Sequence, residues 1–130
     1  MCVFCKIIDG AIPSSKVYED DEVLAILDLS QTTKGHTIVM PKKHYANMLE
    51  IPTDEFASLM GKVKTIAQLL VTKLSANGCN ILINTNESAG QTVMHLHVHI
   101  IPRFDETDGI NIEFKENPNA DLAAVLKEII

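Results

Sequence analysis

The feature that most constrains this chain is the stretch QTVMHLHVHIIPRF at positions 91–104, in which three histidines alternate with apolar residues. The chain has five histidines in 130 residues, and three of them are His95, His97 and His99. Successive side chains of a β-strand point to opposite faces, so we expect the three imidazoles on one face, about 6.5 to 7 Å apart in sequence order. Pro102 should close this strand, because proline cannot donate to a sheet ladder.

Three interpretations of this row of imidazoles are open. It could be the polar face of an exposed strand, although such faces usually carry Thr, Lys and Glu. It could bind a metal ion, with Asp28 or His36 as a further ligand. It could also catalyse a reaction, in which one imidazole is the nucleophile and its neighbours orient it and protonate a leaving group.

The polar loop NTNESAGQT, which precedes the histidines, favours the catalytic interpretation. Backbone N–H groups at Gly90, the side-chain amide of Gln91 and the hydroxyl of Thr92 can converge on one phosphate. A glycine in a polar loop is a weak signal alone. Its position shortly before the three histidines makes it a much stronger one.

Composition limits the fold to one domain and limits the kinds of ligand. A chain of 130 residues with 46% apolar and 22% charged residues is typical of a single globular domain with one core. The net charge of -6 argues against a nucleic-acid polymer as partner, because such a ligand needs a basic face. No segment has the roughly 20 apolar residues of a membrane span, and Lys6 and Asp9 interrupt the N-terminal stretch. We therefore expect a cytoplasmic protein without membrane contact, which binds any anion through local donors.

The three cysteines do not form a disulfide framework, because their number is odd and two of them are only three residues apart. Cys2 and Cys5 form a C-x-x-C motif, which could be half of a zinc site, a redox pair or two inert thiols. A redox pair would follow a strand, and no strand precedes position 2. A zinc site would need two further ligands, which histidines could supply. Cys79 lies in the apolar run CNILIN and is expected to be buried and inert.

The remaining patterns predict an α+β fold with a mainly antiparallel sheet. Strand patterns occupy positions 16–29 (a hairpin around an acidic turn), 36–40, 79–84 and 92–102. Apolar residues at helical spacing predict one long helix within 51–78, with Thr53 as its N-cap. The tail NPNADLAAVLKEII predicts a second, C-terminal helix with Asn117 as its cap. We expect both helices to pack on the sheet.

Together these motifs resemble the histidine triad (HIT) family of nucleotide hydrolases and transferases. The family signature alternates three histidines with apolar residues and ends in two apolar residues, and here it is HLHVHII, residues 95–101. The stretches CVFCKIIDGAIPSSKVYEDDEVLAILDLSQTTKGHTIVMPKKH and INTNESAGQTVMHLHVHIIPRF are similar to the two halves of bacterial members. The resemblance covers nearly the whole chain and implies a single HIT domain over residues 1–130, in a homodimer.

The resemblance also implies roles for individual residues. The family nucleophile falls on His97, and two histidines beside the phosphate fall on His99 and His36. The ribose contact falls on Asp28, a carboxylate that resembles the phosphoramidate-hydrolase side of the family. Contacts to phosphate or leaving group fall on the loop before the histidines, at Asn84, Gln91 and Thr92, next to Gly90.

Zinc-containing bacterial members use the C-x-x-C motif, a histidine after Pro-Lys-Lys and the first histidine of the triad. These positions are Cys2, Cys5, His44 and His95 here, a ligand set that suits tetrahedral zinc. The implied zinc is structural and takes no part in the chemistry. His95 would then anchor the catalytic strand to the N-terminus.

The resulting prediction is a hydrolase of purine nucleoside phosphoramidates, with adenosine as the base, that acts at the α-phosphorus through a nucleotidyl-histidine intermediate. A neutral imidazole suits this role if its Nδ1–H donates to a backbone carbonyl, because its Nε2 lone pair is then free. The rival within the family is a dinucleoside polyphosphate hydrolase. A rival of another class is a nucleotide-binding or scaffold protein without catalysis.

Overall fold

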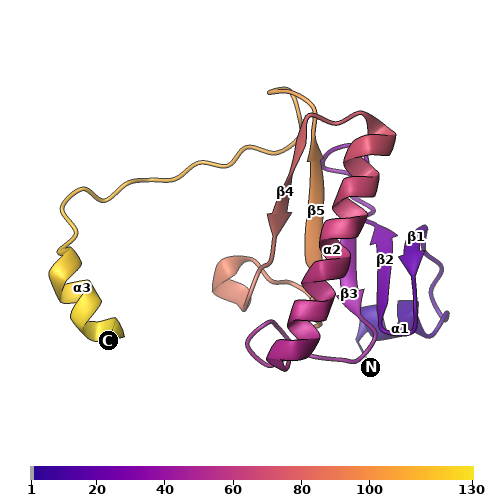
Figure 1. The fold of residues 1–130 in the computed structure, drawn as a ribbon, viewed down its shortest axis with the longest axis horizontal. Coiled ribbons are helices and arrows are strands. Elements are labelled where there is room, and N and C mark those ends of the chain that lie inside the picture. The colour runs from indigo at the N-terminus through magenta and orange to yellow at the C-terminus, as the bar shows by residue number, and fades with distance from the viewer. Residues whose placement is uncertain (1) are drawn as a thin grey trace.

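The computed structural model describes residues 2–130, and its sheet has five antiparallel strands in the order β1-β2-β3-β5-β4 (Figure 1). The predicted α+β class with a mainly antiparallel sheet is confirmed. In chain order the elements are α1 (Val3–Ile8), β1 (Lys16–Glu19), β2 (Val23–Leu27), β3 (Thr37–Pro41), α2 (Thr53–Leu74), β4 (Gly78–Leu82), the 3-10 helix η1 (Glu87–Ala89), β5 (Val98–Arg103) and α3 (Leu122–Ile129).

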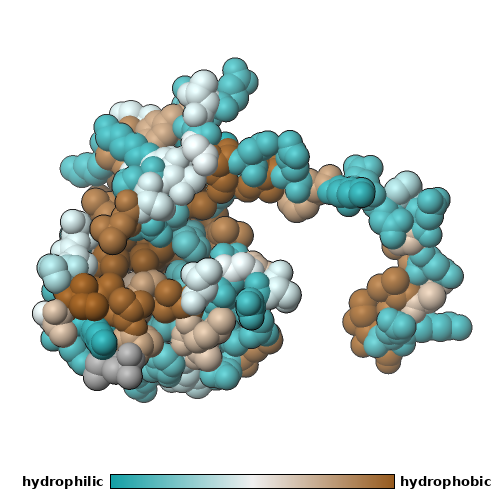
Figure 2. Space-filling view, turned by 180° about the vertical axis from the view of Figure 1, so that it is seen from behind, coloured by the Kyte–Doolittle hydropathy of each residue, from teal (hydrophilic) through white to brown (hydrophobic). Residues whose placement is uncertain are grey.

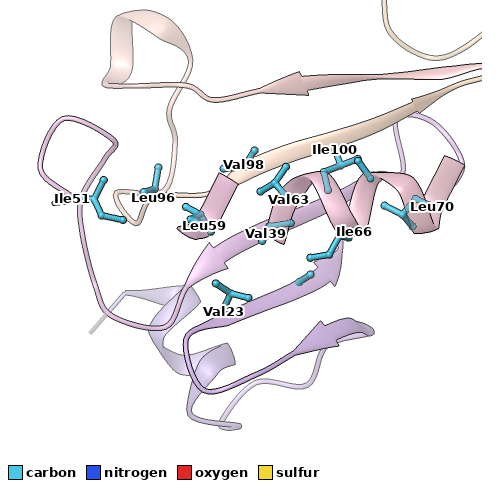
Figure 3. Close-up of a cluster of buried hydrophobic side chains, with 12 residues drawn as sticks. Val23, Val39, Ile51, Leu59, Val63, Ile66, Leu70, Leu96, Val98 and Ile100 are labelled. Carbon is cyan, nitrogen blue, oxygen red and sulfur yellow. The ribbon is translucent and has the colours of Figure 1, made fainter. Parts of the chain in front are cut away.

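The long helix α2 covers one face of the sheet and closes the main core (Figure 3). Its buried residues recur at helical spacing, at Leu59, Val63, Ile66 and Leu70, and they pack on alternate strand residues such as Val39. The helix begins at Thr53, so Pro52 takes the N-cap position that was predicted for Thr53, and no side chain caps it. Asp54 and Glu55 in its first turn suit the positive end of the helix dipole.

The opposite face of the sheet is covered by α1, a helix that the sequence patterns did not predict. Strand residues that point away from α2, such as Leu24 and Met40, pack with Phe4 of α1 in a second buried cluster. The helix is only six residues long, and the sulfur of Cys2 caps it by accepting a hydrogen bond from the backbone N–H of Cys5. Both faces of β2 and β3 are therefore buried, which explains their unbroken apolar sequences.

The strand that contains the histidines is shorter than predicted, because β5 begins at Val98. His95 and His97 precede it, where the backbone leaves the sheet. There the N–H of Leu96 donates to the carbonyl of Tyr45 at 2.7 Å, in the loop before α2. The predicted strand is therefore too long, because only His99 of the three histidines belongs to β5. The predicted alternation nevertheless holds, since Leu96, Val98 and Ile100 pack in the core with α2. The rings of His95 and His97 lie on the other side, against Phe4 of α1.

The C-terminal helix also differs from the prediction. It begins at Leu122, after a cap by Asp121, while Asn117 lies in a turn in which its carboxamide oxygen accepts from the N–H of Asn119. The helix does not pack on the sheet, because every residue of 111–130 is exposed and the segment extends away from the body (Figure 1). Within residues 2–130, no helix is long and apolar enough to cross a membrane.

Candidate active site

An open cleft lies on the α1 side of the sheet, where β2, β3 and β5 meet the loop before β5. Its volume is about 390 Å³, within the range of pockets that bind small molecules. Apolar residues of α1 and the sheet form one part of its wall, and Figure 2 shows apolar side chains gathered on this face of the molecule. Its polar wall contains six of the predicted site residues, namely Asp28, Asn84, Gly90, Thr92, His97 and His99.

His97 has the geometry of an oriented neutral imidazole. Its Nδ1 atom lies 2.8 Å from the backbone oxygen of His95, which can only accept, so Nδ1 carries the proton and Nε2 keeps its lone pair. The side chain is 8% exposed and packs edge-on against the ring of Phe4. Burial lowers the pKa of His97, although the bond to His95 and the charge of Asp28 partly oppose this shift.

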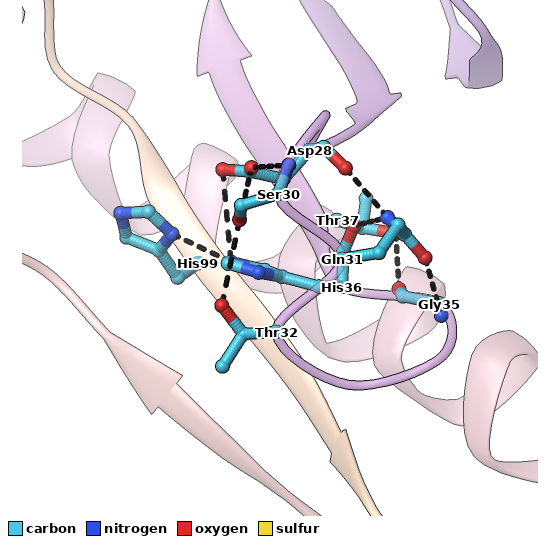
Figure 4. A network of polar contacts seen from close by, with 8 residues as sticks. All are labelled: Asp28, Ser30, Gln31, Thr32, Gly35, His36, Thr37 and His99. Carbon is cyan, nitrogen blue, oxygen red and sulfur yellow. Dashed lines mark hydrogen bonds and ion pairs between the residues drawn. The ribbon is translucent and has the colours of Figure 1, made fainter. Parts of the chain in front are cut away.

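His99 and His36 form a pair of imidazoles (Figure 4). The ring centroid of His99 lies 5.1 Å from that of His97. The Nδ1 atom of His99 and the Nε2 atom of His36 are 2.9 Å apart, so one of these two rings donates to the other. Burial lowers the pKa of His99 to about 4, and the neighbouring His97 and His36 add to this shift. Burial also lowers the pKa of His36, so both rings are neutral near pH 7.

Asp28 lies at the rim of this pair and is held by a tight turn. Its Oδ1 atom accepts from the backbone N–H and the hydroxyl of Ser30, at 2.8 and 2.6 Å. Its Oδ2 atom lies 3.8 Å from Nε2 of His36. The hydrogen bonds from Ser30 and the nearby histidines hold the pKa of Asp28 below its ordinary value, although burial opposes this.

The loop before β5 brings a hydroxyl and a backbone turn to the cleft. Gly90 has a φ of 94°, which favours glycine, and the amide of Asn84 lies 3.7 Å from the place that a Cβ at Gly90 would occupy. The side chain of Gln91 is not brought to the cleft, because its amide donates to the carbonyls of Ala46 and Val93 and its oxygen accepts from a loop N–H. Gln91 therefore shapes the loop.

A second cluster joins the N-terminus to the segment before β5. It consists of the four residues that resemble the family's zinc ligands, and their Sγ and Nδ1 atoms are 3.1 to 3.6 Å apart. Tetrahedral zinc with these donors has ligand atoms about 3.4 to 3.8 Å apart, so the cluster has the size and the chemistry of a zinc site. Its members are Cys2, Cys5, His44 and His95.

The orientation of His95 also suits a metal ligand. Its Nε2 atom lies 2.8 Å from the carbonyl oxygen of Pro41, so Nε2 carries the proton and the Nδ1 lone pair points to the cluster. Burial, together with the sulfur of Cys2, raises the pKa of Cys5, and a cation at the centre would favour its thiolate instead. A second group that could hold a metal is the trio in the cleft, Asp28, His36 and His99.

Phe4 is a site residue that the sequence patterns did not reveal. Its ring lies edge-on to His97 at 4.9 Å and to His95 at 6.0 Å, and it also lines the cleft. Its position between Cys2 and Cys5 was the one available signal, because a side chain between two ligands lies near the metal cluster. The carbonyls of Pro41 and Tyr45 could not be found in this way, since their roles depend on tertiary contacts.

Comparison with known proteins identifies the family. The HIT domain matches residues 9–106 of the chain. The chain belongs to the HIT family. A HIT-like protein of Methanocaldococcus jannaschii is 51% identical over 99% of this chain and 98% of its own length. An adenosine 5'-monophosphoramidase of Candida albicans is 37% identical over 85% of this chain and 76% of its own length.

Solved structures of HIT proteins share the fold. The crystal structure of a HIT family protein from Bacillus anthracis is 44% identical, covers 98% of this chain and 91% of its own, and has a TM-score of 0.91. A zinc-bound histidine triad family protein from Mycobacterium smegmatis is 37% identical, covers 91% of this chain and 84% of its own, and has a TM-score of 0.78. The α+β HIT fold is therefore shared along almost the full length of the chain.

Proposed function

We propose that this HIT protein hydrolyses purine nucleoside phosphoramidates of the AMP-amine type, with His97 as the nucleophile. The observation that carries the proposal is the orientation of His97, whose Nδ1–H is fixed on the His95 carbonyl while the ring lines the cleft. A lone pair at Nε2 is thus directed without any cost of reorientation during the reaction. The cleft is large enough for a nucleotide, and one of the relatives is an adenosine 5'-monophosphoramidase.

The proposed reaction has two steps at the α-phosphorus. In the first, Nε2 of His97 attacks phosphorus, the P–N bond of the substrate breaks, and the leaving amine takes a proton from the hydrogen-bonded pair of His99 and His36, which would carry one extra proton when the phosphoryl anion is bound beside it. In the second, water attacks phosphorus, returns its proton to His99 and breaks the P–Nε2 bond. The products are the free amine and the nucleoside monophosphate, and the enzyme is restored.

The groups around His97 suit the charge that develops on the phosphoryl oxygens. The hydroxyl of Thr92, the amide of Asn84 and the backbone at Gly90 line the cleft and bind the anion without a basic surface. Asp28 lies where it can accept from the ribose hydroxyls through its Oδ2 atom. Gln91 acts indirectly, because its hydrogen bond to the Ala46 carbonyl holds the loop in place. His36 acts through its hydrogen bond with His99.

We further propose that the cluster of two cysteines and two histidines binds one structural zinc ion. The donor distances and the orientation of His95 support this, and so does the zinc-bound relative from Mycobacterium smegmatis. The zinc would fix α1 against the segment that contains the nucleophile. With these four protein ligands the ion would have no open position, so it would leave the chemistry to His97.

We also propose that the protein is a cytoplasmic homodimer without nucleic-acid or membrane partners. An apolar groove between α2 and β4, lined by Val63, Ala67, Val71 and Ile81, supports this proposal. Strand β4 is an edge of the sheet, which could pair with the same strand of a second copy. The acidic net charge of -6 is unfavourable for binding to polyanions.

The first test is AMP release from adenosine 5'-phosphoramidate by the wild type and by His97→Ala, each with and without brief chelation. Turnover that survives chelation and disappears in the variant supports a histidine nucleophile with zinc outside the chemistry. Equal turnover in both proteins, or immediate loss of wild-type turnover on chelation, contradicts it and favours a metal at the trio in the cleft. Faster turnover of a dinucleoside polyphosphate would favour the family rival.

A further inference from the structure

The turn between β2 and β3, residues 28–36, carries a site residue at each of its two ends. Asp28 lies at its start and His36 at its end, and the N–H of Asp28 donates to the carbonyl of His36 at 2.9 Å. Their side chains and that of His99 have polar atoms that all lie within 4.8 Å of one another. The conformation of this turn therefore sets the geometry of one side of the cleft.

The ring of His36 depends on this turn for its position. Its side chain is buried, and its Nε2 atom lies 2.9 Å from Nδ1 of His99. Its Nδ1 atom is also buried and has no hydrogen-bond partner among residues 2–130. Because no hydrogen bond at Nδ1 orients the ring from its other side, the backbone at His36 decides how well Nε2 meets His99.

The side chain of Gln31 ties the two ends of the turn together from inside (Figure 4). Its Nε2 atom donates to the carbonyls of Asp28 and His36, at 2.7 and 2.8 Å. Its Oε1 atom accepts from the N–H of Gly35 at 2.8 Å. Both N–H donors and the oxygen of this amide are thus used on the backbone. Gln31 fixes the backbone of two site residues, although it does not line the cleft itself.

The backbone of Gln31 adds an independent observation. Its φ is 42°, in the left-handed region where a long side chain is uncommon and glycine is free of strain. Glycine would suit a turn that needed only this conformation, as it does at Gly35, where φ is 88°. Residues held in such strained conformations gather at functional sites. The side chain of Gln31 supplies what glycine cannot, namely its three hydrogen bonds.

We propose that Gln31 is a positioning residue, whose carboxamide sets the ring of His36 against His99 for proton transfer to the leaving group. The inference rests on the proposed reaction, in which this pair protonates the leaving amine. Without the amide, the backbone at His36 would relax and the contact with His99 would lengthen. The turn as a whole would stay on the body, because Gly35 packs so closely on α2 that a Cβ there would lie 2.3 Å from Cδ1 of Leu74.

The test compares two substrates that differ in their need for a proton. The leaving amine of adenosine 5'-phosphoramidate must be protonated, whereas the p-nitrophenyl ester of AMP releases a stable anion. Gln31→Gly removes the amide and relieves the backbone strain, so this variant should stay folded. We expect kcat/KM for the phosphoramidate to fall about tenfold to a hundredfold, and that for the ester no more than about threefold. Equal losses on both substrates, or no loss on either, would overturn the proposal.

Two further variants separate the amide from the backbone. Gln31→Ala also removes the amide but keeps the strained φ, so it should be less stable than Gln31→Gly and change the two substrates in the same ratio. Ser75→Gly relieves another left-handed residue, with a φ of 55°, at the end of α2 and away from the cleft. We expect it to leave both substrates unchanged. A ratio that differs between the two Gln31 variants, or that shifts in Ser75→Gly, would contradict the role of the amide.

A measurement without substrate separates this proposal from the proposed reaction. The ring-nitrogen NMR signals of His36 and His99 report the hydrogen bond between the two rings. We expect these signals to shift in Gln31→Gly and to stay in place in Ser75→Gly. Unchanged signals in Gln31→Gly would overturn the positioning role. A wild type that turns over neither substrate, but whose signals shift in Gln31→Gly, would overturn the proposed reaction and not the positioning of the ring.

Discussion

The cleft and the proposed zinc cluster each use a histidine, but in two different ways. His95 and His97 are two residues apart, and each has one ring nitrogen fixed on a backbone carbonyl. The free nitrogen of His95 points to two sulfurs and another imidazole, in a closed centre. The free nitrogen of His97 belongs to a ring that lines an open cleft. The difference shows that the surroundings of the second nitrogen, and not the residue type, decide the role of each histidine.

The two regions are also physically connected. The carbonyl of His95 orients His97, and the ring of Phe4 contacts both imidazoles. A displacement of His95 would therefore rotate the proposed nucleophile. The comparison predicts that the cleft controls turnover directly, whereas the cluster controls stability and affects turnover only through position.

The largest expected effect is the difference in turnover between the variants His97→Ala and His44→Ala. We expect His97→Ala to lower kcat/KM for adenosine 5'-phosphoramidate by about 10⁴-fold or more, because removal of a nucleophile removes the covalent route. The thermal midpoint should change little. His44→Ala should lower metal content and thermal stability while the folded protein keeps most of its turnover. Comparable losses of turnover in the two variants would remove the distinction between the regions.

The next effect concerns stability and compares Cys5→Ser with Cys79→Ser. Cys5 belongs to the cluster, whereas Cys79 lies on β4 and takes no part in it. A metal present at a thousand times its dissociation constant stabilises the folded state by about 4 kcal/mol. We expect Cys5→Ser to lose most of this free energy of unfolding, measured by denaturant titration with zinc present. A large loss in Cys79→Ser, or none in Cys5→Ser, would contradict the structural role.

Much of the fold follows from the sequence because local patterns determine it. The strands β2 and β3 are short apolar runs and the long helix α2 has apolar residues at helical spacing, and packing then confirms both patterns. The start of β5 could not be predicted, since the alternation of His95 to His99 continues past the point where Leu96 leaves the sheet for Tyr45. Helix α3 was expected to pack on the sheet because it has an apolar side. That pattern predicts burial of the side but does not reveal which surface covers it.

The candidate site was predictable in part. The cleft brings Asp28, Asn84, Thr92, His97 and His99 together from three separate segments, as the resemblance to the family implies. It could not be foreseen that the amide of Gln91 is consumed within its own loop, since that depends on backbone groups from distant segments. The assignment of these residues to catalysis stays a prediction that the variants test.

The pH dependence of turnover should show a smaller effect, with a clear direction. Burial lowers the pKa of His97, and attack needs its unprotonated Nε2. The acid limb of kcat/KM should therefore lie below pH 6.5, the value of an ordinary histidine.

The lowered pKa values also mean that the unfolded chain binds more protons than the folded one as pH falls from 6.5 toward about 4, the pKa of His99. Stability should decrease over this window, and His99→Gln should reduce that decrease in a denaturant titration.

The smallest expected effect is that of Asp28→Asn. This variant tests whether the charge of Asp28 acts on the histidines of the cleft and leaves the cluster unchanged. The Asp28 carboxylate raises the pKa of His36, His97 and His99 against the larger effect of burial. Its removal should move the acid limb of kcat/KM to lower pH and lower the maximum about tenfold, the range of a lost hydrogen bond to substrate. Zinc content should be unchanged, because Asp28 does not contact the cluster. An acid limb that moves to higher pH would show that Asp28 does not act through its charge on these imidazoles.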